Sequence, residues 1–365
     1  AIAYLLLFTA TPAEACTTAV ISGKYTADGK PMLWKLRDTD FLDNAIKYYA
    51  SGKYSFIGLI NSQDRGTQVW AGVNEAGFAI MNAASCNVNE GYQGEKIDQE
   101  GVIMRRALAQ CAKLDDFFKF LKRMDTPRGL ATSFGVIDAN GGAAYFDVDN
   151  EKITRFDAND QRFAPHGYIL RTNYSFTGKK DQGYGYIRYQ SAQDLFAQTD
   201  ATGNLNFKTI IQDFSRSFYH SLLNTDYETL ATELSSKPYF INSGDLMTRQ
   251  GTSSAVVIQG VKQNQNPQLT TMWSLVGFPH TTVTIPLWVS KNGELPQWVT
   301  LNDNGHAPIC QKALELKKQC YPIARSSGYK YMNLTALINK EGSGISQQLR
   351  PLEEKLITRA NQLLK

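Results

Sequence analysis

The residues with the clearest chemical potential lie near the start of the chain, where an apolar segment ends directly before a cysteine. The segment reads AIAYLLLFTATPAEA, and Cys16 follows it. If cleavage after Ala15 made Cys16 the first residue, one residue would carry both a thiol and a free α-amino group. An α-amine has a pKa of about 7.7–8.0, so it can accept the thiol proton near neutral pH and later return it. The pattern predicts a nucleophile that needs no histidine as its base.

The segment PMLWKLRDTD offers the charged groups that such a nucleophile needs. A cation near the sulfur favours the thiolate, and a carboxylate can hold an ammonium group by charge-assisted hydrogen bonds. Arg37 and Asp40 are the candidates for these two tasks. Strand alternation puts them on opposite faces, so a bend after Arg37 is needed for both to reach Cys16. On its own, R-x-x-D is also a common arrangement of surface charges at the end of a strand.

The first fifteen residues have the pattern of the end of a secretory signal peptide. An apolar run over 2–8 precedes a proline and the small-residue step Ala-Glu-Ala. The run is shorter than the roughly 20 apolar residues that span a membrane. We therefore expect residues 1–15 to be a signal peptide remnant, residues 16–365 to form a single domain, and the protein to be exported, either periplasmic or secreted.

A different class of protein shares this arrangement. In a lipoprotein, Cys16 would carry a lipid and do no chemistry. A lipobox usually has leucine three residues before the cysteine, and this chain has Ala13 there. The lipoprotein therefore remains the alternative rather than the first interpretation.

Composition and charge narrow the class of protein further. The chain has 365 residues, 42% apolar and 20% charged, with a formal net charge of +4. These values are typical of a globular domain with a substantial core. The basic residues are scattered, so we expect no nucleic acid as partner and no polybasic membrane patch.

The cysteines and histidines give little sign of a metal site. No C-x-x-C spacing occurs and the four histidines are dispersed, so we expect no metal and no cofactor. The five cysteines leave one over from an even set. Cys310 and Cys320 could close a small disulfide loop, whereas Cys86 and Cys111 are expected to be buried free thiols.

Apolar periodicity and turn residues predict the elements that must position these groups. Strands are expected over 17–22, 31–35, 55–60, 67–73, 78–83, 133–138, 143–148, 153–156, 168–173, 255–260, 270–275 and 282–289. Helices are expected over 103–111, 114–121, 189–198, 210–222 and 349–363. Asn74 and Gly77 are expected to form a simple hairpin turn. Groups of strands separated by groups of helices indicate an α+β fold of two packed sheets with helices outside, rather than a βαβ array.

Several stretches resemble one enzyme family. The segments CTTAVISGKYTADGKPMLWKLRDTD, GVNEAGFAIMN and RTNYS resemble, in that order, the linear-amide C–N hydrolases. That family includes the choloylglycine (bile salt) hydrolases, the penicillin V acylases and the related acyl-CoA:6-aminopenicillanate acyltransferases. The resemblance implies an N-terminal nucleophile (Ntn) hydrolase fold, a four-layer αββα sandwich of two mainly antiparallel sheets.

The resemblance also implies roles for individual residues. Cys16 matches the nucleophile, Arg37 the arginine near the thiol, and Asp40 the aspartate that binds the α-amine. Asn173 matches the asparagine that helps to form the oxyanion hole, a contact worth about 3 kcal/mol in comparable sites. Arg249, just before SSAVVIQ, resembles the late arginine of the acyltransferase branch.

Two further residues match the family less closely. Asn82 lies two positions before the place of a second oxyanion donor, and Arg188 is shifted by three from an arginine of the bile salt hydrolases. Both are tentative oxyanion or substrate-binding residues. These departures move the interpretation away from a bile salt specialist and towards the acyltransferase-like branch.

The sequence therefore predicts an exported cysteine amidase that hydrolyses a small-molecule N-acyl amide through a thioester on Cys16. An acyltransferase that passes the same acyl group to an amine is an alternative, beside the lipoprotein. The sequence leaves open the acyl group, the leaving amine and whether the chain forms a homo-oligomer.

Overall fold

Two large antiparallel sheets dominate the computed structural model, which describes residues 15–92 and 99–364. The six-stranded sheet contains, in spatial order, β10 (Tyr168–Arg171), β1 (Ala15–Ile21), β2 (Met32–Asp38), β14 (Thr252–Gln259), β15 (Thr271–Val276) and β16 (Ile285–Leu287). The seven-stranded sheet contains β3 (Asn44–Tyr49), β4 (Phe56–Asn61), β5 (Ala71–Asn74), β6 (Ala79–Ala84), β7 (Thr132–Ile137), β8 (Ala143–Val148) and β9 (Ile153–Asp157).

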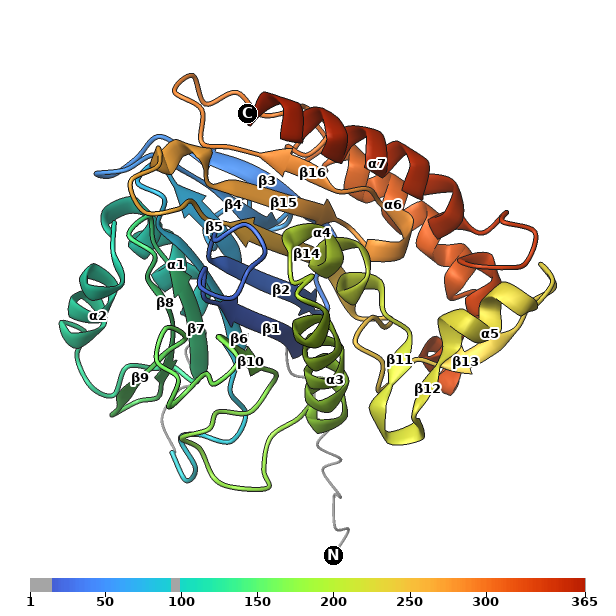
Figure 1. The fold of residues 1–365 in the computed structure, drawn as a ribbon, viewed down its shortest axis with the longest axis horizontal. Coiled ribbons are helices and arrows are strands. Elements are labelled where there is room, and N and C mark those ends of the chain that lie inside the picture. Colours follow the sequence, from blue (N-terminus) through green and yellow to red (C-terminus); the bar gives the residue numbers. More distant parts are fainter. Residues whose placement is uncertain (1–14, 93–98, 365) are drawn as a thin grey trace, which may run out of the picture.

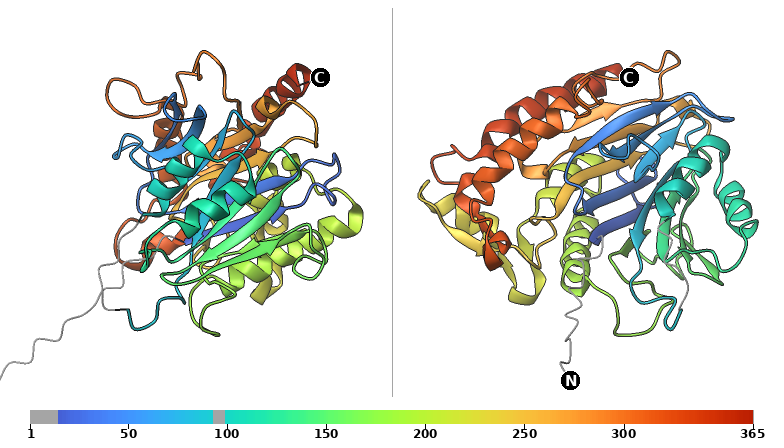
Figure 2. Two further views of the ribbon diagram at one scale, coloured as in Figure 1. Left: turned by 90° about the vertical axis from the view of Figure 1, so that its left-hand side faces the viewer. Right: turned by 180° about the vertical axis from the view of Figure 1, so that it is seen from behind.

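Helices cover the outer face of each sheet (Figures 1 and 2). The seven-stranded sheet packs against α1 (Glu100–Gln110) and α2 (Leu114–Lys122). The six-stranded sheet packs against α3 (Tyr186–Thr202), α4 (Phe207–Gln212) and α7 (Ile345–Leu363). The predicted αββα sandwich of two antiparallel sheets is confirmed.

A smaller group of elements, which includes α6, lies beside the six-stranded sheet (Figure 1). It contains α5 (Tyr227–Glu233), α6 (Pro308–Cys320) and two small sheets, β11 (Tyr219–His220) with β12 (Thr225–Asp226) and β13 (Phe240–Asn242) with β17 (Tyr331–Asn333). Short 3₁₀ turns are η1 (Phe214–Arg216), η2 (Ser221–Leu223), η3 (Pro267–Leu269), η4 (Pro279–Thr281), η5 (Ser326–Lys330) and η6 (Leu334–Ala336).

The central strands β1 and β2 are buried on both faces, and their alternation decides which side chains meet. Val20 and Leu33 belong to the core between the two sheets, whereas Ala19 and Trp34 belong to the core under the helices. Since side chains alternate along a strand, Cys16 shares the face of Val20, towards the other sheet. Arg37 shares the face of Leu33 for the same reason. The nucleophile candidate and its arginine thus face the space between the sheets.

The predicted turn between β5 and β6 is confirmed. Gly77 has φ of +75° and donates its backbone N–H to Asn74. The Asn74 side chain accepts from Phe78 and donates to the carbonyl oxygens of Leu108 and Cys111. This asparagine therefore joins the turn to the end of α1.

Predictions about one helix and about three cysteines need correction, and some elements were not predicted. The helix expected over 210–222 breaks after α4 into η1 and β11, and the sequence analysis missed α6 and β3. Cys310 and Cys320 both lie on α6, so the helical rise separates them by about 15 Å, far beyond disulfide reach. Both are free thiols, and Cys86 is exposed rather than buried.

Two expectations concern membranes and export. Within the described part of the chain, no helix combines the length and the apolar character needed to cross a membrane. The predicted signal peptide remnant covers mainly residues 1–14, which lie outside the described residues.

Candidate active site

The site is built on the neighbouring strands β1 and β2, which pair Cys16 directly with Arg37. Cys16 is 3% exposed and Arg37 1% exposed. Directly opposed residues on one face of an antiparallel pair have Cβ atoms roughly 4.5–5.5 Å apart. The register therefore places the Arg37 side chain next to that of Cys16 on the inner face of the sheet.

The Arg37 guanidinium group is fixed by neutral partners. Its Nη1 donates to the side-chain oxygens of Asn44, at 2.8 Å, and Asn61, at 2.9 Å. The guanidinium carbon lies 4.7 Å from the ring centroid of Trp70. These contacts fix the position of the guanidinium group in the space between the sheets.

Asn173 holds the backbone nitrogen of Cys16. The Cys16 N–H donates to Asn173 Oδ1 at 3.0 Å, and Arg188 Nη2 donates to the same oxygen at 2.8 Å. Both partners can only donate, so they fix the orientation of the amide. Asn173 Nδ2 consequently points the other way and donates to the carbonyl oxygen of Ala84 at 3.2 Å.

Arg188, a tentative candidate from the sequence, lies at the centre of this network. It stands in the first turn of α3, and its Nη1 donates to the Cys16 carbonyl oxygen at 2.8 Å and to Thr17 Oγ1 at 3.1 Å. Burial and the neighbouring charge of Arg249 lower its pKa to about 10. Arg188 therefore remains a cation at neutral pH, held against the backbone of Cys16.

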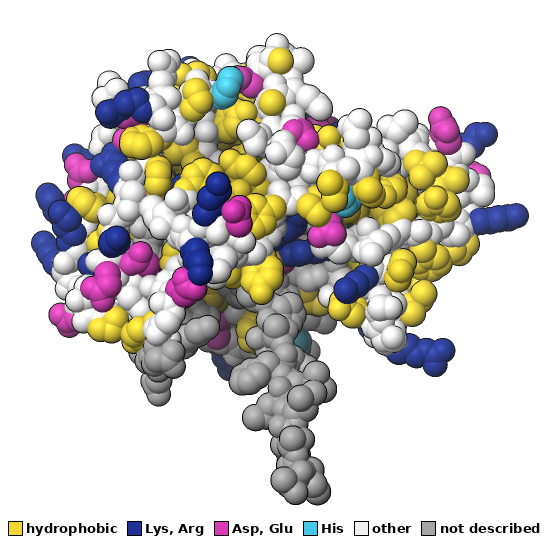
Figure 3. All heavy atoms as spheres, turned by 90° about the horizontal axis from the view of Figure 1, so that it is seen from below, with side chains coloured by type: hydrophobic (Ala, Val, Ile, Leu, Met, Phe, Trp, Pro, Cys, Tyr) yellow, Lys and Arg dark blue, Asp and Glu magenta, His cyan; other side chains and the backbone are white. Residues whose placement is uncertain are grey.

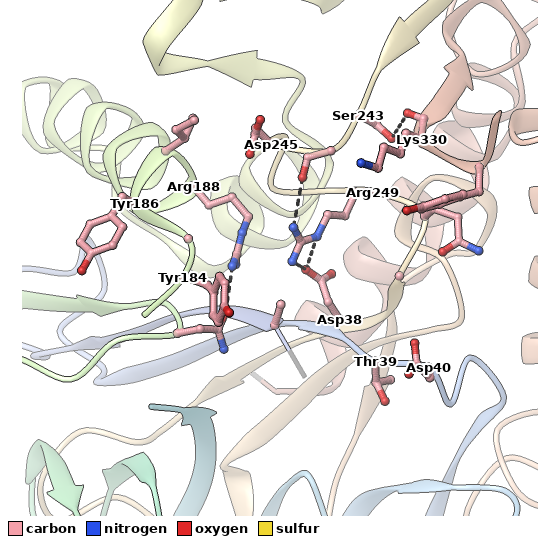
Figure 4. A pocket seen from close by; sticks show the side chains of 18 of the residues that line it. Asp38, Thr39, Asp40, Tyr184, Tyr186, Arg188, Ser243, Asp245, Arg249 and Lys330 are labelled. Atoms are coloured by element: carbon pink, nitrogen blue, oxygen red, sulfur yellow. Dashed lines mark hydrogen bonds and ion pairs between the residues drawn. The ribbon is translucent and has the colours of Figure 1, made fainter. Parts of the chain in front are cut away.

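A cavity of about 650 Å³ opens beside this network (Figure 4). Ala15 and Asn173, on either side of the Cys16 backbone amide, both line it. Its walls come from the end of β2, the start of α3, the segment 243–251 and the end of η5. The bond between Ala15 and Cys16 thus lies at the wall of this cavity.

Both acidic residues of the RDTD segment, Asp38 and Asp40, line the cavity. Asp38 Oδ2 accepts from Arg249 Nε at 2.8 Å, and Asp38 Oδ1 accepts from Thr252 Oγ1 at 2.6 Å. Figure 4 shows Asp38 and Arg249 pointing toward each other, with Asp40 to one side. Strand β2 ends at Asp38, and the chain bends at Asp40. Asp40 lies at the exposed rim of the cavity, and its predicted role at the α-amine stays a prediction.

Asn82 lies on β6, in the other sheet. Its Oδ1 accepts from Lys35 Nζ at 2.7 Å, and its Nδ2 donates to Thr132 Oγ1 at 3.3 Å. The structure therefore gives this amide two partners in the space between the sheets, and its tentative role as an oxyanion donor is untested.

The other cysteines differ from Cys16 in their surroundings. Burial raises the pKa of the Cys111, Cys310 and Cys320 thiols to about 12. Cys86 is exposed and is the one of these four that a reagent in solution can reach directly.

Sequence reasoning missed two features of the site. It did not predict the pairing of Asp38 with Arg249 or the buried position of Lys35. A signal for the second was available, because Lys35 and Arg37 are two charged residues at alternate positions of an otherwise apolar strand.

Comparison with known proteins places the chain in a family. The family model of acyl-coenzyme A:6-aminopenicillanic acid acyl-transferase matches residues 37–235, more than half of the chain. The matched region contains Arg37, Asp40, Asn82, Asn173 and Arg188 and excludes Cys16 and Arg249. No curated protein matches the sequence.

Solved structures of amide-cleaving enzymes resemble the structure of this chain at low sequence identity. A variant of conjugated bile acid hydrolase from Clostridium perfringens is 13% identical with a TM-score of 0.42, covering 77% of this chain and 94% of the other. Penicillin V acylase from Agrobacterium tumefaciens is 13% identical with a TM-score of 0.43, covering 76% and 86%. The N-acylethanolamine-hydrolyzing acid amidase ortholog of Caenorhabditis elegans is 13% identical with a TM-score of 0.42, covering 67% and 92%. By its match to the family model, the chain belongs to the acyl-coenzyme A:6-aminopenicillanic acid acyl-transferase family.

Proposed function

We propose that the protein is a cysteine N-terminal nucleophile amidase that hydrolyses a linear N-acyl amide after cleavage between Ala15 and Cys16. One observation carries the proposal. The Cys16 nitrogen is held by Asn173 Oδ1 at the wall of the cavity, while Arg37 lies opposite the same residue on β2. A free amine formed at that nitrogen would stay in place, beside its own thiol.

The reaction follows from these positions. The α-amine of Cys16 takes the thiol proton, and the thiolate attacks the carbonyl carbon of the substrate. A C–S bond forms, and the carbonyl π electrons move to the oxygen. When the tetrahedral species collapses, the C–N bond breaks and the ammonium group of Cys16 protonates the leaving amine. Water then attacks the thioester, which releases a carboxylic acid and restores the thiol.

Asn173 contributes in two ways in this mechanism. Its Oδ1 orients the α-amine, and its Nδ2 is an N–H donor of the kind that stabilises a tetrahedral oxyanion. Arg188 supports both tasks because it fixes the orientation of the amide.

The cavity walls support a substrate with an apolar acyl group. Tyr184, Tyr186 and Tyr329 line the cavity, and each is substantially exposed. Exposed aromatic side chains continue onto β13 and β17 with Phe240 and Tyr331. Figure 3 shows hydrophobic side chains gathered on that side of the molecule. Aromatic walls with a few polar groups are typical of small-molecule sites.

Acyl transfer is the second candidate, and the family match favours it, because the model is named for an acyltransferase. The same thioester would then react with an amine instead of water. Adding a primary amine to a hydrolysis assay distinguishes the two, because a transferase forms the new amide at the expense of the free acid.

We also propose that the protein is exported, on the strength of the predicted leader. The lipoprotein alternative is less compatible with the site, since Cys16 is 3% exposed within a central strand. Mass spectrometry of the mature N-terminus separates a free cysteine from a diacylglycerol adduct.

The proposal is tested by replacing the nucleophile. Cys16→Ala should fold and lose turnover of a panel of N-acyl amides, and Cys16→Ser should keep little activity, because a hydroxyl is a far weaker nucleophile. Iodoacetamide should modify Cys16 and abolish turnover in step with labelling. That assay needs a Cys86→Ser background, since Cys86 is exposed. An active Cys16→Ala variant would refute the proposal.

A further inference from the structure

A second buried cation lies on the strand face that carries Arg37. Lys35 stands two residues before Arg37 on β2, is 2% exposed, and faces the space between the sheets. Its Cα partner on β1 is Thr18, which stands two residues after Cys16 on the same face. Cys16, Thr18, Lys35 and Arg37 therefore form the four corners of one patch on the inner face of the sheet.

The Lys35 ammonium group is held between the two sheets. Its Nζ donates to the carbonyl oxygen of Trp70 at 2.9 Å and to Asn82 Oδ1 at 2.7 Å, and lies 5.8 Å from the Trp70 ring centroid. Both of these acceptors are neutral oxygen atoms. Burying an ammonium group is costly, and a neutral donor could tie the sheets together at lower cost.

The two cations share one aromatic ring. The Arg37 guanidinium carbon lies 4.7 Å from the Trp70 centroid, on the same indole that contacts Lys35. Diagonal neighbours on paired strands lie within reach of long side chains. Cys16 thus has one cation directly opposite on β2 and a second on the diagonal.

We propose that Lys35 is a positioning residue that acts through Cys16, forming with Arg37 a two-cation cradle that favours the thiolate. The assignment rests on the proposed function, in which Cys16 is the nucleophile. A second positive charge in a water-poor space adds to the stabilisation that Arg37 gives the anionic sulfur.

Other ionisable groups also face this space. Arg171 pairs with Asp147, with Nε and Oδ1 3.4 Å apart, so that pair contributes little net charge. The hydroxyl group of Tyr145 donates to Thr18 Oγ1 at 2.7 Å, and burial raises the pKa of this phenol, so it stays neutral. A substitution of Lys35 therefore changes the charge in this space at residue 35 and leaves these other groups as they are.

The test is the thiol pKa of Cys16, read from thiolate ultraviolet absorbance as the difference between each protein and its Cys16→Ala counterpart. The full chain is used, so the reading does not depend on removal of residues 1–15 or on turnover. In Lys35→Met the thiol pKa should rise by about one unit, at the lower end of the effect of a nearby opposite charge. Lys35→Arg, which keeps the charge, should hold the thiol pKa close to that of the unaltered chain.

A matched control comes from another buried lysine. Lys317 on α6 is 5% exposed and donates to the carbonyl oxygens of Gln250 and Thr252. Burial lowers the pKa of Lys317 to about 7, so Lys317→Met reports the effect of losing a buried lysine side chain without the loss of a full charge, and it should leave the Cys16 thiol pKa unchanged.

Two outcomes would overturn the proposal: an unchanged thiol pKa in folded Lys35→Met, or an equal rise in Lys317→Met. If Lys35→Met does not fold, Lys35→Gln takes its place, because it keeps an N–H donor for the Trp70 carbonyl oxygen. An unchanged Cys16 thiol pKa in Lys35→Gln would then overturn the proposal. Failure of the amidase itself is recognised separately, by turnover in Cys16→Ala.

Discussion

At the scale of single residues, the charge of Arg188 tunes the proposed base. Its Nη2 and the Cys16 nitrogen donate to the same oxygen, Asn173 Oδ1. A protonated α-amine at that position would lie close to a buried guanidinium group, and like charges disfavour the protonated form. Arg188 should therefore lower the α-amine pKa and keep the amine available as a base near neutral pH.

This gives a prediction for the pH dependence of kcat/KM. In Arg188→Met the α-amine pKa should rise, so the acidic limb of the profile should move to higher pH by up to about one unit. Arg188→Lys keeps a positive charge and should shift the limb less. An acidic limb that stays in place in a folded Arg188→Met protein would mean that this guanidinium group does not act on the base.

At the scale of elements, the start of α3 delivers Arg188 to the site and depends on a glycine. Gly185 precedes the helix with φ of +90°, and an added Cβ would lie 3.0 Å from the Thr172 Cβ and closer still to the Arg188 guanidinium group. An L-residue in this backbone region costs roughly 1–2 kcal/mol. Gly185→Ala should therefore lower stability by about that amount and also reduce kcat at least about tenfold, by displacing Arg188.

The other end of the same helix supplies the control. Gly203 has φ of +67°, and an added Cβ would meet no atom within 4 Å. Gly203→Ala should show a similar loss in urea unfolding with unchanged kcat. Equal losses of kcat in the two variants would contradict a specific role for the start of α3.

The same scale shows what local sequence could and could not predict. The strands predicted over 17–22 and 31–35 correspond to β1 and β2, but the structure begins β1 at Ala15 and continues β2 to Asp38, which brings Cys16 and Arg37 into the strands. Periodicity carries no information about which strands pair or in which register, and the neighbours of Cys16 depend on that register. For this reason the sequence could not show that Asn173 Oδ1 accepts from the Cys16 nitrogen. The contact of Arg188 with Cys16 could not be predicted either, because it joins segments 172 positions apart.

At the scale of the whole molecule, one buried carboxylate connects α7, the C-terminal helix, to segments that pack beside the six-stranded sheet. Glu353 on α7 is 0% exposed and accepts from the Arg216 guanidinium group at 2.8 and 2.9 Å, from the Thr284 N–H at 2.7 Å and from Gln212 Nε2 at 2.9 Å. Burial alone would raise the pKa of Glu353, but the charge of Arg216 and these hydrogen bonds outweigh it and lower the pKa to about 2.

This network predicts a sensitivity to acid. A folded pKa below the usual unfolded value of about 4.3 gives stability that is present above that value and is lost as the pH falls towards 2. Glu353→Gln should lower the free energy of unfolding at neutral pH by about 3–5 kcal/mol, since it leaves Arg216 buried without its counter-charge. Urea unfolding should show this difference at pH 7 and a smaller one at about pH 3. A difference that does not shrink in acid would exclude this origin.

The central claim is that catalysis needs a free α-amine on Cys16, and one assay tests it most directly. Turnover of an N-acyl amide is measured for the chain that begins at Cys16 and for the same chain that retains residues 1–15, each verified by intact mass. An amide nitrogen cannot accept the thiol proton, so the retained leader should leave turnover at background, whereas the chain that begins at Cys16 should be active. Comparable turnover by the uncut chain would contradict the account.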